Sequence, residues 1–245
     1  MDFKNKAIII TGGSGGIGIA TAKRFASLGG IIVLADLKED ALHKAADEVK
    51  QAGAAEVWTS VCDVTDESHV SATVSGTVQR YGHVDVIVNN AGLMLFKPIE
   101  EQTIQDWQRI FNVDLFGAFF FTKHAFKQMK PGGAIVNVSS IHAIETEPMV
   151  APYAAAKAAV LSLTRSAAIE GKPKGIRVNA ILPGAIDTPM LWDNPNVKSG
   201  VEKINKDDVG KPEDIANAIA YLSSDEACFI QGAMLRVDGG RLDHL

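Results

Sequence analysis

The sequence has no run of basic residues, and its 29 acidic residues outnumber the 24 basic ones to give a net charge of −5. This balance argues against nucleic acid or an anionic membrane surface as the main partner. No apolar stretch approaches the roughly 20 residues that span a bilayer. The amino-terminal residues lead into a short apolar segment rather than a signal-peptide core. We therefore expect no membrane association and, by default, a cytoplasmic location.

A cysteine framework and a histidine cluster are also missing from the sequence. The two cysteines, Cys62 and Cys228, lie far apart and form no CxxC motif. Reduced thiols are therefore favoured over a disulfide. The six histidines are scattered without the spacing of metal ligands, so no metal centre is expected.

Short apolar segments alternate regularly with longer amphipathic ones. The apolar segments are nearly continuous, which is typical of strands buried on both faces of a parallel sheet. They are residues 7–10, 31–35, 57–61, 84–88, 134–138, 176–181 and 233–237. Segments with helical spacing between them are residues 17–28, 41–51, 70–81, 104–129, 153–169 and 212–222. This order predicts a doubly wound, Rossmann-type α/β fold with a seven-stranded parallel sheet and helices on both faces.

No linker or shift in composition divides the chain. Residues 1–245 are therefore predicted to form a single dinucleotide-binding and catalytic domain. The stretch 185–208 is irregular and long for a connection between a strand and a helix. Loops of that length within compact domains are usually functional, so we expect a substrate loop or lid there.

A glycine-rich turn follows the first predicted strand and opens the first predicted helix. It lets backbone N–H groups approach a pyrophosphate at the positive end of the helix. The turn lacks the Gly-Lys-Ser/Thr ending of a P-loop, which disfavours a triphosphate. A methyltransferase that binds S-adenosylmethionine would carry a similar turn. The predicted cofactor residues in it are Gly12, Ser14, Gly15, Gly16, Ile17 and Gly18.

Asp36 ends the second predicted strand, 18 residues past Gly18. A carboxylate at this place accepts hydrogen bonds from the adenosine ribose diol and repels a 2′-phosphate. No Arg or Lys lies in the glycine turn or at position 37, although Lys38 is a weak contrary indication. NAD is therefore favoured over NADP.

Tyr153 and Lys157 lie one turn apart on the helix that begins near Pro152. Taken alone, a tyrosine and a lysine at this spacing indicate only the surface of an ordinary amphipathic helix. Ser140, however, follows the fifth predicted strand, whose carboxyl end should face the ligand crevice of a doubly wound sheet. The three residues are therefore predicted to meet.

In combination, these pieces resemble the short-chain dehydrogenase/reductase family in its compact, single-domain form. The resemblance covers essentially the whole chain and is specific because the pieces occur in order and at the family's spacings. Besides the glycine turn, they are Asp63-Val64, Asn89-Asn90-Ala91-Gly92, Asn112, Ser140, Tyr153-x-x-x-Lys157, Pro183-Gly184 and Val237-Asp238-Gly239-Gly240.

The resemblance implies a nicotinamide-dependent oxidoreductase with four catalytic residues. A free tyrosine titrates near pH ~10 and needs help to act as a base at neutral pH. Lys157 would favour the phenolate of Tyr153, and Ser140 would position the substrate oxygen. Asn112 would support a water that leads protons to Lys157. Ser140 is preferred to Ser139, which should support the turn, because Ser140 lies 13 residues before Tyr153.

The family pattern also implies cofactor contacts outside the glycine turn. Asp63 and Val64 would contact the adenine, the turn after the fourth strand would close on the adenosine, and Lys157 would hold the nicotinamide ribose. Asn89 is expected to be mainly structural. The full predicted set is Asp36, Leu37, Asp63, Val64, Asn90, Ala91, Gly92, Tyr153, Lys157, Pro183, Gly184, Ile186 and Thr188.

The predicted substrate pocket is largely apolar, which suits a hydrophobic or ring-bearing alcohol or ketone. Its candidate residues are Ser140, His142, Met94, Met149, Met190 and Trp192. Glu145 and Glu147, in the loop before Tyr153, would indicate a polyol or a cationic substrate if either faces inward.

The leading hypothesis is an NAD-linked dehydrogenase of secondary alcohols, running in reverse as a ketone reductase. One alternative is reduction of a 3-oxoacyl thioester on an acyl carrier protein, docked on Lys127, Lys130, Lys172 and Lys174. Another is a catalytically silent dinucleotide-binding protein, against which the intact catalytic set argues. By analogy with the family, we expect a homotetramer with helices 104–129 and 153–169 at an interface.

Overall fold

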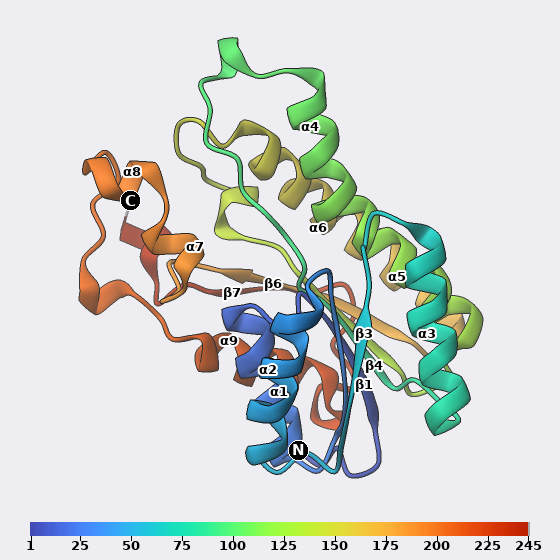
Figure 1. Ribbon diagram of the computed structural model, residues 1–245. Helices are drawn as coiled ribbons and strands as arrows, with labels where there is room; N and C mark the ends of the chain where they lie inside the picture. The colour runs from blue at the N-terminus through green and yellow to red at the C-terminus, as the bar shows by residue number, and fades with distance from the viewer. Residues whose placement is uncertain (245) are drawn as a thin grey trace.

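A computed structural model of the chain describes residues 1–244, including the side chains of all of these except residues 206, 243 and 244. At its centre is one parallel seven-stranded sheet with the order β3-β2-β1-β4-β5-β6-β7 (Figure 1). The strands are β1 (Ala7–Thr11), β2 (Ile31–Asp36), β3 (Glu56–Val61), β4 (Val86–Asn89), β5 (Ala134–Val138), β6 (Arg177–Pro183) and β7 (Met234–Val237). The predicted doubly wound fold is confirmed, and the strand order reverses between β1 and β4.

Helices cover both faces of this sheet (Figure 1). One layer consists of α1 (Gly16–Ser27), α2 (Glu39–Gln51) and α9 (Pro212–Ser223); the other consists of α3 (Glu67–Tyr81), α4 (Ile104–Phe111), α5 (Gly117–Gln128) and α6 (Ala151–Gly171). Successive side chains of a strand point to opposite faces, so β1 contributes to both cores. Ile8 joins Phe25 of α1 on one side, and Ile9 joins Phe121 of α5 on the other.

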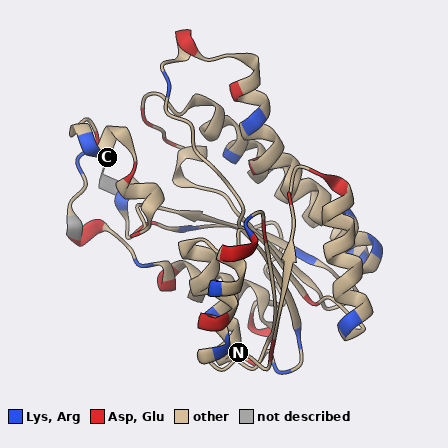
Figure 2. Ribbon diagram, in the orientation of Figure 1, with Lys and Arg blue, Asp and Glu red and all other residues tan. Residues whose placement is uncertain are grey.

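The inner strands of the sheet are buried on both faces, as predicted, and the edge strands are not. β1, β4 and β5 are buried throughout, whereas β3 and β7, at the two edges, are partly exposed. Short helical segments complete the fold: α7 (Pro189–Trp192), α8 (Pro195–Ser199), η1 (Ile99–Glu101), η3 (Ile141–Ala143), η4 (Lys172–Lys174), η5 (Lys206–Asp208), η6 (Asp225–Ala227) and η7 (Arg241–His244). Acidic and basic residues are mixed over both helical layers (Figure 2).

The predicted helix over 104–129 changes its winding midway. α4 ends at Phe111, a π-helical segment η2 (Asn112–Phe116) follows, and α5 begins at Gly117. Segments of this kind are rare and are frequent at functional sites. η2 places the side chain of Asp114 in the protein interior, with none of it exposed.

Within residues 1–244, no helix combines the length and the apolar character that crossing a membrane requires. In the same part of the chain, no group of three or more His, Cys, Asp or Glu side chains is placed to hold a metal ion.

Candidate active site

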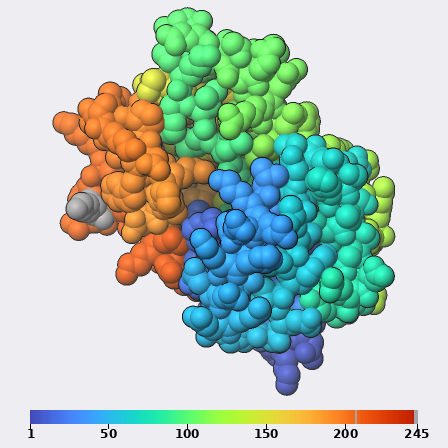
Figure 3. Space-filling view, viewed as in Figure 1, coloured from blue at the N-terminus to red at the C-terminus, as the bar shows by residue number. Residues whose placement is uncertain are grey.

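A cavity of about 560 Å³ opens at the carboxyl ends of the strands, around the point where their order reverses. In the space-filling view it lies between the orange segment that follows β6 and the blue and green segments that follow β2 and β4 (Figure 3). Its volume is within the range of ligand-binding cavities, and its position is where open α/β sheets bind their ligands.

Nearly all the predicted cofactor residues line this cavity. They are Gly12, Ser14, Gly15, Gly16, Ile17, Asp36, Leu37, Asp63, Val64, Asn90, Ala91, Gly92, Tyr153, Lys157, Pro183, Gly184, Ile186 and Thr188. Gly18 is the exception in the predicted set, because it is buried beneath the turn against the backbone of Gly12.

The glycine turn presents backbone rather than side chains to the cavity. α1 begins directly after Gly15, no side chain caps it, and its first turn contains no acidic residue. Three of the residues that open this helix, Gly15, Gly16 and Ile17, line the cavity. The unpaired N–H groups of the first turn are therefore available to an anionic ligand.

The carboxylate of Asp36 is fixed at the end of β2 by the same turn. Its Oδ2 accepts hydrogen bonds from the backbone N of Ser14 at 3.1 Å and from Ser14 Oγ at 2.6 Å. Its Oδ1 accepts one from the backbone N of Leu37 at 2.7 Å. The group is thus held in one orientation at the cavity wall, with Lys38 also lining the cavity.

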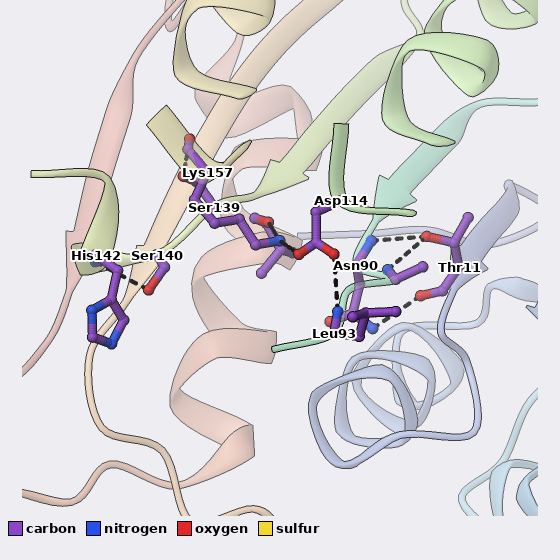
Figure 4. Close-up of polar contacts among 10 residues, drawn as sticks. Thr11, Asn90, Leu93, Asp114, Ser139, Ser140, His142 and Lys157 are labelled. Atoms are coloured by element: carbon purple, nitrogen blue, oxygen red, sulfur yellow. Dashed lines mark hydrogen bonds and ion pairs between the residues drawn. The ribbon is translucent and has the colours of Figure 1, made fainter. Parts of the chain in front are cut away.

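Asn90 connects the turn after β4 to β1, and Asn89 connects β4 to β5. Asn90 Nδ2 donates to the carbonyl oxygen of Thr11 at 2.9 Å, and Thr11 Oγ1 accepts from the backbone N of Asn90 and of Ala91, each at 2.9 Å (Figure 4). Asn89 Nδ2 donates to Asn137 Oδ1 at 2.8 Å within the core. Asn89 therefore has the structural position that the sequence predicts.

Ser140, Tyr153 and Lys157 meet at the cavity as predicted. Lys157 Nζ lies 5.5 Å from the centroid of the Tyr153 ring and donates to the carbonyl oxygen of Val138 at 3.1 Å. Ser140 Oγ accepts from the backbone N of His142 at 3.2 Å. Ser139 Oγ donates to the carbonyl oxygen of Lys157 at 2.8 Å, so this serine attaches β5 to α6 (Figure 4).

Burial and the neighbouring charges both shift the pKa values of Tyr153 and Lys157. Burial raises the pKa of the Tyr153 phenol, the Lys157 ammonium lowers it, and the Asp114 carboxylate raises it again. The Ser140 hydroxyl lowers this pKa as well. The net result is a pKa above the usual value for tyrosine. Burial lowers the pKa of Lys157, but Asp114 and Tyr153 outweigh burial and hold that pKa above its usual value. Lys157 is therefore a cation at neutral pH.

The structure does not bring the predicted Asn112 into the site. Asn112 begins η2 with its side chain exposed, because the π-helical turn directs that position outward and the position two residues later inward. Asp114 occupies the place instead: its Oδ2 lies 3.2 Å from Lys157 Nζ, and its Oδ1 accepts from the backbone N of Leu93 at 3.0 Å (Figure 4). The sequence feature that could have indicated Asp114 is that it is a single acidic residue between the apolar Val113 and Leu115.

Four of the six candidate substrate residues line the cavity. Ser140, His142, Met94 and Met190 line the cavity, together with Leu93, Ile141 and Leu191. Met149 and Trp192 do not line it. Met149 has a left-handed backbone, with φ of 69°, and its carbonyl oxygen accepts from the backbone N of Lys97. Trp192 Nε1 donates instead to Asp187 Oδ1 at 2.7 Å, and its side chain is partly exposed.

A polar cluster that sequence reasoning missed forms one wall of the substrate end. Asn194, Glu202 and Arg241 line the cavity there. Asn194 Nδ2 donates to Glu147 Oε1 at 2.8 Å and to Glu202 Oε2 at 3.3 Å, and Glu202 forms an ion pair with Arg241. Of the two acids considered in the sequence, Glu147 belongs to this cluster, and Glu145 is exposed.

Burial, reinforced by Glu147 and opposed by Arg241, raises the pKa of Glu202 to about 7. Because this pKa lies above that of an unfolded glutamate, the group stabilises the fold fully at low pH, and that contribution is lost as pH rises through about 7. We expect Glu202→Gln to remove this pH dependence, so that the loss of Tm between about pH 5 and about pH 8 shrinks by about 2 °C.

Thermal unfolding of both proteins at the two pH values measures this effect. Glu145→Gln is the control, because it removes an exposed acid from the neighbouring loop. An unchanged loss of Tm in the E202Q variant would show that Glu202 is ionised in the folded protein throughout this range.

Comparisons with known proteins show the family of this chain. A family model described as enoyl-(acyl carrier protein) reductase matches residues 12–241. The chain is 40% identical to the cis-4-hydroxycyclohexanecarboxylate dehydrogenase of Sinomonas cyclohexanicum, with 97% of each chain covered. The structure of levodione reductase superimposes with a TM-score of 0.93 at 34% identity, covering 99% of this chain and 100% of the other. The structure of NAD⁺-bound xylitol dehydrogenase gives 0.89 at 32% identity, covering 98% and 100%. The chain therefore belongs to the short-chain dehydrogenase/reductase family and is a nicotinamide-dependent oxidoreductase that acts on CH–OH groups.

Proposed function

We propose that this protein is an NAD-dependent dehydrogenase of secondary alcohols that also reduces the corresponding ketones. The observation that carries the choice of NAD is the fixed carboxylate of Asp36 at the end of β2. A 2′-phosphate on the adenosine ribose would meet this negative charge at close range, whereas a ribose diol would donate hydrogen bonds to it. The similarity to an NAD⁺-bound dehydrogenase supports the same choice.

The residues present fit a dinucleotide along the whole cavity. The uncapped first turn of α1 suits a pyrophosphate, and Asp36 suits the adenosine ribose. Asp63 and Val64 line the adenine end, and Ile186 and Thr188, after β6, line the part next to Tyr153 and Lys157. We propose that these residues hold the cofactor and that the segment 185–208 serves as a lid over the substrate.

The proposed chemistry divides between the cofactor and the chain. The bound nicotinamide supplies hydride transfer to or from the reacting carbon. Tyr153 accepts the hydroxyl proton during oxidation and returns it during reduction. Lys157 stabilises the phenolate by its charge. Ser140 Oγ already accepts from the backbone N of His142, which leaves its own proton to donate to the substrate oxygen and orient it.

The walls of the cavity suit a cyclic or compact alcohol that carries a second polar group. Leu93, Met94, Ile141, Met190 and Leu191 supply apolar walls, and the polar cluster at the other wall offers both donors and acceptors. The relative from Sinomonas cyclohexanicum is named for a cyclic hydroxy acid, which has this combination. NADH formation with cyclohexanols, hydroxycyclohexanecarboxylates, polyols and hydroxyacyl thioesters, each repeated with NADP, tests the proposal.

The cofactor preference gives a sharper test. Asp36→Asn keeps the size of the side chain and removes its charge, so we expect the ratio of kcat/KM for NADP to that for NAD to rise about tenfold. Asp40→Asn, which removes an exposed acid from the first turn of α2, should leave that ratio unchanged. A wild-type protein that prefers NADP, or an unchanged ratio in the D36N variant, would overturn the proposed role of Asp36.

Reduction of a carrier-bound thioester has less support. Lys127 and Lys130 precede the amino end of β5, and Lys172 and Lys174 precede the amino end of β6. The cavity opens at the carboxyl ends of the strands. A carrier protein docked on these lysines would therefore sit at the opposite edge of the sheet from Tyr153.

We also propose a homotetramer and a cytoplasmic location. Exposed apolar side chains on one helical layer, Phe116 and Phe119 near the start of α5 and Ile169 of α6, supply a surface that association would bury. Cys228 is an exposed free thiol, which the reducing cytoplasm would preserve.

A further inference from the structure

A buried ion pair adjoins the proposed general acid–base. Asp114 Oδ2 lies 3.2 Å from Lys157 Nζ, and 0% and 4% of the two side chains are exposed. The backbone N of Leu93 donates to the carboxylate, and the carbonyl oxygen of Val138 accepts from the ammonium. Burial raises the pKa of the Asp114 carboxyl, and the Lys157 ammonium and the Leu93 N–H oppose that rise by favouring the carboxylate. Both groups are held in fixed positions in the protein interior (Figure 4).

Gly92 and the segment η2 leave room for this ion pair. A Cβ at Gly92 would lie 2.9 Å from Asp114 Oδ2 and 3.1 Å from Lys157 Nζ, so a larger residue there would displace one of them. The π-helical segment η2 is also needed for this ion pair, because it turns Asp114 rather than Asn112 inward. Two independent features, a glycine and an irregular helical turn, therefore support one contact.

The pair changes the electrostatics around Tyr153. The groups that face the phenol are Lys157 from α6, Asp114 from η2, Ser140 and His142, whose ring centroid lies 5.8 Å from that of Tyr153. Burial lowers the pKa of His142, so this ring is neutral at neutral pH. The one cation that would stabilise a phenolate is therefore matched by a carboxylate at ion-pair distance among these groups.

We propose that Asp114 is a positioning residue that fixes Lys157 and offsets its charge, so that Lys157 stabilises the phenolate of Tyr153 less than an unpaired lysine would. Alcohol oxidation then needs a higher pH than it would beside an unpaired Lys157, because Tyr153 must first lose its proton. The pH dependence of oxidation that follows from this inference rests on the proposed function, whereas the charge balance itself does not.

Absorbance of tyrosinate tests the charge balance without substrate or cofactor. The chain has three tyrosines, and Tyr153→Phe identifies by subtraction the titration that belongs to Tyr153. Asp114→Asn keeps an oxygen for the Leu93 N–H and removes the charge. We expect the Tyr153 midpoint to fall by about one pH unit in the D114N variant. Asp40→Asn, which removes an exposed acid of the same size from the first turn of α2, should leave the midpoint unchanged.

The pH profile of oxidation gives the functional readout, with cyclohexanol as probe. The alkaline limb of kcat should move down by the same one unit or so in the D114N variant. A uniform loss at every pH, with an unmoved tyrosinate midpoint, would show that Asp114 is merely structural and would overturn the inference. Failure to oxidise cyclohexanol would count against the proposed substrate class, and the absorbance titration would still decide the role of Asp114.

Discussion

Replacing Tyr153 with Phe should lower kcat for alcohol oxidation about 10³-fold, within the range by which a positioned acid or base accelerates proton transfer. The substitution removes one oxygen and keeps the ring, which packs in a small core cluster with Ile110, Val150 and Ala156. We therefore expect the fold to remain intact and the dissociation constant for NADH to change by less than about threefold.

Steady-state kinetics in both directions and titration of NADH fluorescence measure these two quantities. Tyr221→Phe is the matched control, because Tyr221 lies on α9 with its side chain partly exposed. Turnover that survives in the Y153F variant would assign the proton transfer to another group. A wild-type protein that binds NADH and oxidises none of the tested alcohols would instead favour a catalytically silent dinucleotide-binding protein.

Gly18→Ala should cost about 3 kcal/mol of folding free energy or more, the upper range for overpacking a filled interior. A Cβ at Gly18 would lie 2.2 Å from the carbonyl oxygen of Gly12 and 3.0 Å from the Cα of Gly13, and both of these neighbours are backbone. The clash therefore cannot be relieved by rotating a side chain. The turn must move off α1, which also disrupts the surface that lines the cavity.

Gly15→Ala provides a control in the same turn. Its Cβ would meet the carbonyl oxygen of Gly12 at 3.4 Å, an ordinary contact, so its stability should stay within about 0.5 kcal/mol of the wild type. Thermal unfolding without cofactor should show a Tm lower by about 6–10 °C for G18A alone. Equal Tm values for the two variants would mean that the packing of α1 against the turn adjusts at no cost.

The parts of the site that sequence reasoning places well depend on local order along the chain. The glycine turn directly follows β1, Asp36 ends β2, and Tyr153 and Lys157 share one helix, so each position follows from the element that carries it. Their lining of one cavity then follows from the parallel sheet, which gathers the carboxyl ends of its strands at one edge.

The parts that sequence reasoning misplaces depend on departures from regular winding or on contacts between distant segments. Asn112 and Asp114 differ by two positions, and regular helical spacing does not reveal that η2 turns the second inward. The polar cluster joins Glu147, Asn194, Glu202 and Arg241 across almost 100 residues, and no local pattern signals their approach.

The π-helical segment η2 also makes the proposed active site sensitive to the number of residues in the chain. Each residue of a regular helix advances the facing direction by about 100°, so deleting one residue between Phe111 and Gly117 would turn a different side chain toward Lys157. Substitutions at the exposed positions of η2 leave the facing direction as it is. In the evolution or engineering of this protein, an insertion or deletion of one codon here would therefore replace the residue that faces Lys157 while leaving Ser140, Tyr153 and Lys157 themselves unaltered.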